Sequence, residues 1–214
     1  MSQQVRVPMI GVSSDGYAAG RDQSLEQPFG HADPRELLGW AFGTASFPGR
    51  TGPGGSRGLE DLLVREWGRD IGVEIMGRNK FGPQRGPWTD EEWQGWWGDE
   101  PPFHTPVVVM THHERPSFTL GETTFHFVSG TPEEVLAQAK AAASGRDVRL
   151  GGGADTVRQF LDAGLVDSLH VSVAPVELGG GSRLWESPEE LEDRYHHETV
   201  PGSQGVVHHL FWRD

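Results

Sequence analysis

The sequence predicts an α/β domain around a central, mostly parallel β-sheet whose last strands run antiparallel. Short apolar runs at Val5–Val12, Ile71–Gly77 and Pro106–Met110 have the length and β-branched composition of buried strands. Segments with apolar residues at helical spacing separate most strands, and strands take over near the C-terminus. Alternating strands and helices are typical of a parallel sheet covered by helices, and successive strands are typical of antiparallel pairing.

The other elements follow in chain order between Gly- and Pro-rich turns. Helices are predicted from Asp33 or Pro34, over Leu59–Arg69, from Pro132 to Ala143 behind the cap Thr131, and over Ala154–Ala163. Strands are predicted at Thr124–Val128, Asp147–Leu150, Ser168–Val176 and Val206–Trp212. Tyr17–Gly30 and Gly49–Gly58 read as loops, the second of them mobile. No repeat or linker divides the chain, so we expect residues 1–214 to form one domain.

Four tryptophans crowd the segment from residue 81 to residue 103, among glycines, prolines and acids: Trp88, Trp93, Trp96 and Trp97. Aromatic side chains bury large areas, so a floppy linker is a poor interpretation. Two interpretations stay open. The segment is an ordered excursion that packs on the body of the domain, or it is a lid that faces a substrate.

Composition excludes several classes of function. The 214 residues carry 31 acidic and 18 basic side chains, a net charge of −13, which argues against a nucleic-acid binder. Cysteine is absent, which removes disulfides and thiolate chemistry. Met1–Arg6 lacks the apolar core of a signal peptide, and no segment approaches the ~18 apolar residues of a membrane span. We expect a cytoplasmic protein that acts on a small molecule, with no membrane or nucleic-acid partner.

Three predicted strand ends carry residues suited to an anionic ligand. Gly151–Gly153 lies between a strand and a helix, where backbone N–H groups and the helix dipole favour a phosphate; a tight structural turn is the alternative. Arg78 follows a glycine at a second strand end, where a surface salt bridge is the alternative. Thr111 and His112 follow a third. Ligands of open α/β sheets collect at carboxyl ends of strands, so the three signals reinforce one another.

Five segments together resemble the dihydrofolate-reductase-like superfamily, and most closely the stand-alone relatives of the riboflavin-pathway reductase domain (the RibD C-terminal type). They are Ser13–Tyr17, Ile75–Arg78, Val107–Thr111, Leu150–Ala154 and Ala174–Gly181. The resemblance covers nearly the whole chain. It implies a three-layer αβα sandwich, bound NADPH, hydride transfer to a small planar or heterocyclic substrate, and a homodimer.

The resemblance also implies where NADPH lies. Gly77, Arg78 and Asn79 would face the cofactor phosphates, and Thr111 and His112 would reach the 2′-phosphate of the adenosine. Val12 and the loop around Gly20 would border the nicotinamide. The pyrophosphate would lie at the helix N-terminus, covered by Gly151, Gly152, Gly153, Ala154, Asp155 and Thr156. Arg78 gives a physical reason to prefer NADPH over NADH, because the additional phosphate needs a cation.

Three positions depart from the family pattern, so the resemblance leaves the acceptor unnamed. Tyr17 stands where a lysine is usual, Gly151 stands where a glutamate is usual, and Glu36 lies only near the helix that carries the acid of true dihydrofolate reductases. Asp15 is the candidate catalytic acid that does match; a role in capping its own turn is the alternative.

Two further points concern the function class. The pairs His112-His113, His196-His197 and His208-His209 invite a metal site, but adjacent strand residues point to opposite faces, so we expect none.

The rival of the reductase hypothesis is a non-catalytic protein that binds a nucleotide or another small ligand on the same scaffold. NADPH oxidation with some acceptor would separate the two.

Overall fold

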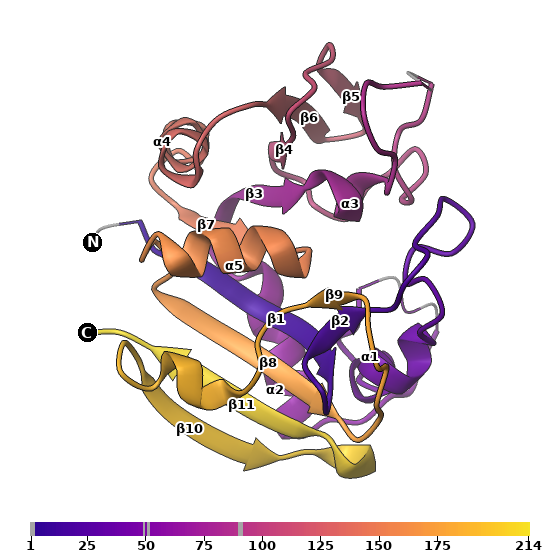
Figure 1. The fold of residues 1–214 in the computed structure, drawn as a ribbon, viewed down its shortest axis with the longest axis vertical. Helices are drawn as coiled ribbons and strands as arrows, with labels where there is room; N and C mark the ends of the chain where they lie inside the picture. Colours follow the sequence, from indigo (N-terminus) through magenta and orange to yellow (C-terminus); the bar gives the residue numbers. More distant parts are fainter. Residues whose placement is uncertain (1–2, 49, 51, 90–91) are drawn as a thin grey trace.

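One nine-stranded sheet runs through the molecule in the order β10-β11-β8-β1-β7-β3-β4-β6-β5 (Figure 1). The computed structural model describes residues 3–48, 50, 52–89 and 92–214. The strands of this sheet are β1 (Val5–Ser13), β3 (Ile71–Gly77), β4 (Val107–Met110), β5 (Phe118–Leu120), β6 (Thr123–Val128), β7 (Asp147–Leu150), β8 (Ser168–Ala174), β10 (His196–Pro201) and β11 (Val207–Trp212). Its centre, β8-β1-β7-β3-β4-β6, is parallel, while β11, β10 and β5 pair antiparallel. The predicted mixed sheet is confirmed.

Five α-helices and three short 3₁₀ turns connect these strands in the described residues. The helices are α1 (Pro34–Phe42), α2 (Leu59–Arg65), α3 (Arg78–Phe81), α4 (Pro132–Ala142) and α5 (Ala154–Asp162). The 3₁₀ turns are η1 (Glu66–Gly68), η2 (Pro188–Leu191) and η3 (Ser203–Gly205). The predicted cap of α4 is confirmed, because the Thr131 hydroxyl accepts from the Glu134 amide while the Glu134 carboxylate accepts from the Thr131 amide.

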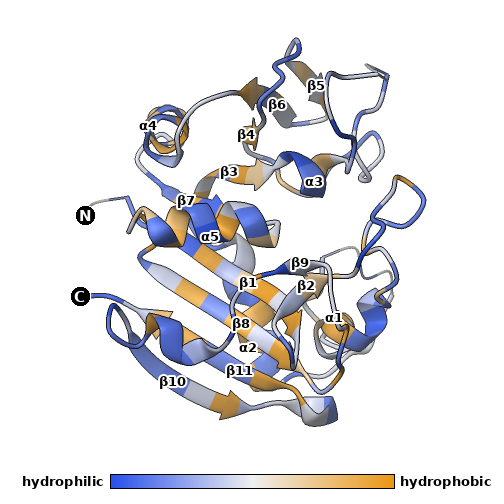
Figure 2. Ribbon diagram, in the orientation of Figure 1, coloured by the Kyte–Doolittle hydropathy of each residue, from blue (hydrophilic) through white to orange (hydrophobic). Residues whose placement is uncertain are grey.

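The helices cover both faces of the sheet, as the three-layer prediction requires. Helices α4 and α5 pack on one face, where Val73 and Ile75 of β3 join their apolar residues in one core cluster. Met76, the next residue of β3, points to the other face and joins Phe81 in a different cluster. Helix α1 packs on β1 and β8 at that second face. Figure 2 shows the alternating polar and apolar residues that give α5 its buried side.

The tryptophan segment covers the second face beside α1. Trp88, Trp93 and Trp97 pack against a cluster built from β3, β4 and β6. The indole N–H of Trp93 donates to Phe81 O at 2.9 Å, and that of Trp96 donates to Lys80 O at the same distance. The ordered excursion, the first of the two interpretations, is therefore confirmed for the described part of this segment.

Helix α2 differs from the pattern that predicted it. It ends at Arg65 and continues as η1, and its buried side chains are Asp61 and Val64. Leu59 and Leu62, which belong to the predicted apolar stripe, are 47% and 54% exposed. The helix presents Asp61 to the interior in place of Leu59 and Leu62. The Asp61 carboxylate accepts a hydrogen bond there from the Ser46 amide at 2.7 Å.

The shortest elements escaped prediction. Tyr17–Gly30 reads as a loop in the sequence, yet β2 (Tyr17–Ala19) pairs with β9 (Ser182–Arg183) in a separate two-stranded sheet. Strand β5 and helix α3 were also missed, because three or four residues are too few to show a period. In the predicted mobile loop Gly49–Gly58, Gly49 and Thr51 lie outside the described residues. Across the described part of the chain, no helix has the length and apolarity needed to cross a bilayer.

Candidate functional site

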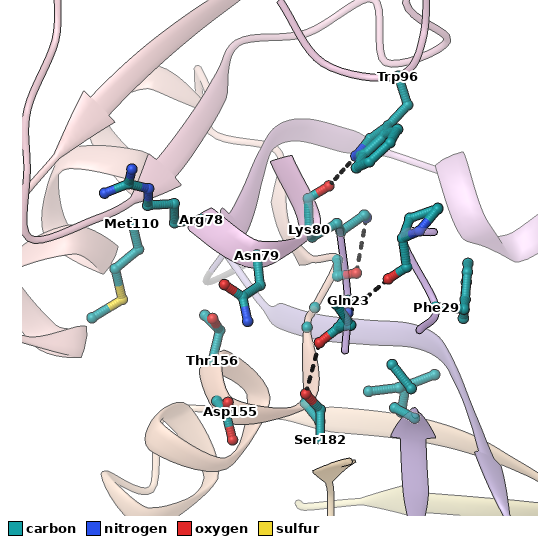
Figure 3. A pocket seen from close by; sticks show the side chains of 18 of the residues that line it. Gln23, Phe29, Arg78, Asn79, Lys80, Trp96, Met110, Asp155, Thr156 and Ser182 are labelled. Carbon is teal, nitrogen blue, oxygen red and sulfur yellow. Dashed lines mark hydrogen bonds between the residues drawn. The ribbon is translucent and has the colours of Figure 1, made fainter. Parts of the chain in front are cut away.

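A cavity of about 870 Å³ lies at the carboxyl ends of β3, β4 and β7, where residues of both α1 and α5 line it. The N-terminus of α5 and the short helix α3 border one half of it. Apolar and aromatic side chains border the other half: Met9, Phe29, Leu38, Trp67, Trp96 and Trp97. The cavity therefore joins a polar region to an apolar one (Figure 3).

Most of the predicted cofactor residues meet in this cavity, although they come from three separate strand ends. The ten that line it are Arg78, Asn79, Thr111, His112, Gly151, Gly152, Gly153, Ala154, Asp155 and Thr156. In Figure 3, Asn79, Asp155 and Thr156 lie together on one side. Gly77, Val12, Gly20 and the candidate acid Asp15 are not among the lining residues.

Gly77 packs the end of β3 directly on the loop before α5. Its N–H donates to Gly152 O at 2.7 Å, and a Cβ at this position would stand 2.0 Å from Thr156 Oγ1. The peptide bond between Gly152 and Gly153 is cis. The first turn of α5 then begins at Ala154, with N–H groups at the cavity wall. Gly77 is therefore required for packing and shapes the cavity from behind.

Arg78 presents donors that have no protein acceptor. Its Nη1 donates to Gly86 O, and the guanidinium stacks over the Trp88 ring at 3.9 Å. Its Nε and Nη2 are buried and find no hydrogen-bond partner among the described residues. Burial lowers the pKa of Arg78 below its ordinary value. The surface salt bridge considered for Arg78 is wrong for the described residues, where no carboxylate pairs with it.

Asp15 lies outside the cavity and holds a loop. Its carboxylate accepts from the Ser13 hydroxyl at 2.6 Å and from the amides of Leu178 and Gly179 at 3.0 and 2.7 Å. Burial opposes the charge, but these hydrogen bonds outweigh it and keep the pKa of Asp15 below its ordinary value. A carboxylate held ionised in this way is a poor proton donor. Only the Ser13 contact lies within the turn of Asp15 itself, and the other two hydrogen bonds join this carboxylate to the distant loop at Leu178 and Gly179.

Val12 and Gly20, which were expected to border the nicotinamide, do not line the cavity. Val12 is fully buried in the core, and Gly20 packs against His31, whose Nδ1 would stand 2.7 Å from an added Cβ. Gly11, beside Val12, and Ala18 and Ala19, just before Gly20, line the cavity instead. Val12 faces the core because the register of β1 against β8 shifts between Val7 and Ile10, a bulge that the sequence pattern does not reveal.

Three charged residues at the cavity escaped prediction. Glu74 is fully buried, Lys80 Nζ donates to Glu74 Oε1 at 2.8 Å, and Arg149 donates to Glu74 Oε2. Burial opposes the charge of Glu74, but the two cations outweigh it and keep its pKa below the ordinary value. Both Glu74 and Arg149 interrupt apolar strand sequences, which is the signal that could have found them.

Among the described residues, no three histidine or acidic side chains gather in a way that could hold an ion. Two of the pairs contribute one or both members to contacts across strands: His208 Nδ1 lies 3.0 Å from His170 Nε2, and His209 Nδ1 lies 3.0 Å from His197 Nε2.

Solved structures share this fold over the full chain. A putative riboflavin biosynthesis protein from Shewanella sp. PV-4 is 19% identical, with a TM-score of 0.55, and 100% of this chain covers 99% of that one. A pyrimidine reductase-like protein from Corynebacterium diphtheriae is 15% identical, with a TM-score of 0.54 and coverage of 99% and 93%.

A diaminohydroxyphosphoribosylaminopyrimidine deaminase/5-amino-6-(5-phosphoribosylamino)uracil reductase from Thermotoga maritima is 12% identical, with a TM-score of 0.56. All of this chain matches 57% of that one. No curated protein matches the chain by sequence. Residues 9–201 match the sequence profile of the RibD C-terminal domain. This match takes in the three strand ends that build the cavity, and the chain accordingly belongs to the RibD C-terminal domain family.

Proposed function

We propose that this protein is an NADPH-dependent reductase that transfers a hydride to a small planar or heterocyclic acceptor. One observation carries the proposal: a single cavity joins an anion-binding region at the start of α5 to an apolar, aromatic region. A dinucleotide and a flat acceptor need these two surroundings side by side. The family and the names of the structural neighbours, a pyrimidine reductase-like protein among them, agree with this chemistry.

The residues present fit the phosphates of a dinucleotide. The buried, unpartnered Nε and Nη2 of Arg78 can satisfy their donors on a phosphate oxygen. Asn79, Thr111 and His112 also line the cavity and would complete the 2′-phosphate region. The N–H groups at the first turn of α5, with Gly151–Gly153 before it, would hold the pyrophosphate.

The chemistry is divided between cofactor and protein. When bound, the nicotinamide supplies the hydride. The chain's own part is to bind the phosphates, to exclude water with Trp67, Trp96 and Trp97, and to hold the acceptor flat against the cofactor half of the cavity. Asp15 has no part in proton delivery in this proposal, because its carboxylate is committed to the loop at Leu178 and Gly179.

Titration with NADPH and NADH tests the proposal through quenching of the 8 tryptophans. We expect micromolar affinity for NADPH and at least about tenfold weaker binding of NADH, since one charge-assisted contact is worth roughly 1.5–3 kcal/mol. Arg78→Ala should remove the difference. The matched control is Arg69→Ala, because the Arg69 side chain is 73% exposed and pairs only with its neighbour Glu66.

The possible outcomes separate the two functional hypotheses. Absence of binding for both dinucleotides would refute the reductase. Binding of NADPH without its oxidation across a broad panel of carbonyl and imine acceptors would favour a non-catalytic NADP(H)-binding protein. Oxidation with any acceptor of that panel would establish hydride transfer.

A further inference from the structure

A cluster of charge lies between the two halves of the cavity. Glu74 of β3 and Arg149 of β7 are direct partners in the register of the parallel strands. Lys80 reaches them from α3 and also donates to Gly151 O at 2.8 Å. Figure 3 shows Lys80 between Asn79 and Thr156 on one side and Trp96 and Phe29 on the other. The cluster therefore sits where a ligand would cross from the polar to the apolar half.

The cluster has more positive charge than its own carboxylate can balance. One carboxylate faces two cations, which leaves a net charge of +1. Both oxygens of Glu74 are already used, Oε1 by Lys80 and Oε2 by Arg149. In the described residues, Glu74 is the only carboxylate in an ion pair with either cation.

Lys80 and Arg149 line the cavity and keep donors that no protein acceptor uses in the described residues. An ammonium has three N–H donors, and Lys80 uses one on Glu74 and one on Gly151 O. A guanidinium has five, of which Arg149 uses two on Glu74 and one, at 3.3 Å, on Trp67 O. The side chains of Lys80 and Arg149 are 31% and 18% exposed, and both line the cavity.

Apolar and aromatic side chains line the cavity together with Lys80 and Arg149. The indole N–H of Trp96 donates to Lys80 O, which fixes its ring beside the cluster. Trp67, Met9 and Leu38 border the same half of the cavity. Aromatic walls of this kind favour a planar ring.

Gly151 keeps the cluster open to the ligand. An added Cβ at this position would stand 2.3 Å from Glu74 Oε1 and 2.5 Å from Lys80 Nζ. The side chain missing from Gly151 is thus what admits Lys80 to the wall of the cavity.

We propose that Lys80 and Arg149 bind an acidic oxygen of the acceptor, so that the site takes planar aromatic or heteroaromatic carboxylates. The assignment rests on the proposed function for calling this ligand the acceptor. A carboxylate there would bring the cluster to neutrality and accept the unused N–H donors, while its ring lies among Trp67, Trp96 and Leu38.

The test uses 2-naphthoate and its neutral amide, 2-naphthamide, titrated without any dinucleotide by tryptophan fluorescence. The two probes share shape and ring and differ in charge. We expect 2-naphthoate to bind at least about tenfold more tightly, as expected for one charge-assisted contact. Lys80→Met should remove that preference. Lys140→Met is the matched control, because Lys140 is the other lysine of the chain and lies in α4, away from the cavity.

Glu74→Gln should strengthen the binding of 2-naphthoate, whereas Lys80→Met should weaken it. A variant with a damaged fold would not bind the probe more tightly. Loss of the carboxylate raises the net charge of the cluster from +1 to +2 and frees donors of Lys80 and Arg149. The affinity for 2-naphthoate should rise about threefold or more, while that for 2-naphthamide stays within about twofold.

Each contrary result would overturn the proposal. These results are equal binding of the two probes, unchanged binding to Lys80→Met, weaker binding to Glu74→Gln, or a preference lost only in Arg78→Ala. Because no dinucleotide is present, the outcome is independent of the NADPH titration. A failed NADPH titration would refute the reductase and leave the carboxylate site to be judged on its own data.

Discussion

Gly77→Ala should destabilise the protein through a single close contact. The Cβ would stand 2.0 Å from Thr156 Oγ1 and 3.2 Å from Thr156 Cβ, whereas ordinary contact begins at 3.4 Å. Relief needs β3 and the first turn of α5 to part by more than about 1 Å, and overpacking of this kind typically costs about 1–3 kcal/mol. Since Gly77 N donates to Gly152 O at 2.7 Å, the same movement would disturb the loop that borders the cavity.

The assay is a double-mutant cycle in urea, with Thr156→Ala as the second change. Thr156→Ala removes Oγ1 and leaves only the 3.2 Å contact with Cβ, so the double variant should recover about 1 kcal/mol or more relative to additivity. Gly68→Ala is the control, because nothing lies within 4 Å of its Cβ, and it should change the free energy of unfolding by less than about 0.5 kcal/mol. Additive effects of Gly77→Ala and Thr156→Ala would refute the reasoning.

The other predictions concern titration, the loop at Asp15 and assembly. Burial, followed by the repulsion of His208, lowers the pKa of His170 to about 3, below its ordinary value of 6.5. The unfolded chain therefore binds more protons between these values, so the free energy of unfolding should fall as the pH is lowered from about 6.5 to 3. His170→Gln should flatten that dependence in urea titrations at several pH values. Asp15→Ala removes the acceptor of the Leu178 and Gly179 amides and should cost about 1–3 kcal/mol in denaturation, with the Kd for NADPH unchanged; a selective loss of NADPH binding would contradict this. Sedimentation should show a homodimer, and a monomer at all concentrations would contradict that expectation.

The core elements were predictable because their apolar patterns are local. Strand β4 is a continuous apolar run, β1 and β3 are mostly apolar, and a helix with a complete capping box follows Thr131. The elements that escaped, β2, β5 and β9, have two or three residues and exist because a partner strand lies beside them. Two or three residues are too few to show a period, and in the case of β2 and β9 the partner also lies far away in the sequence.

Some features of the candidate site could likewise be predicted from local sequence, whereas others depend on contacts between distant segments. The sequence by itself indicated the strand ends with their glycines and Arg78, because three such signals fall at carboxyl ends of strands, where ligands of open α/β sheets collect. Only the tertiary structure decided that Asp15 accepts hydrogen bonds from Leu178 and Gly179, which lie 163 and 164 positions further along the chain. It also decided that Lys80 and Arg149 both contact Glu74. The physical reason is that local residue pattern determines which segment forms a strand or a turn. Whether a carboxylate binds a backbone amide or a cation depends on which distant segment the fold places within about 3 Å of it.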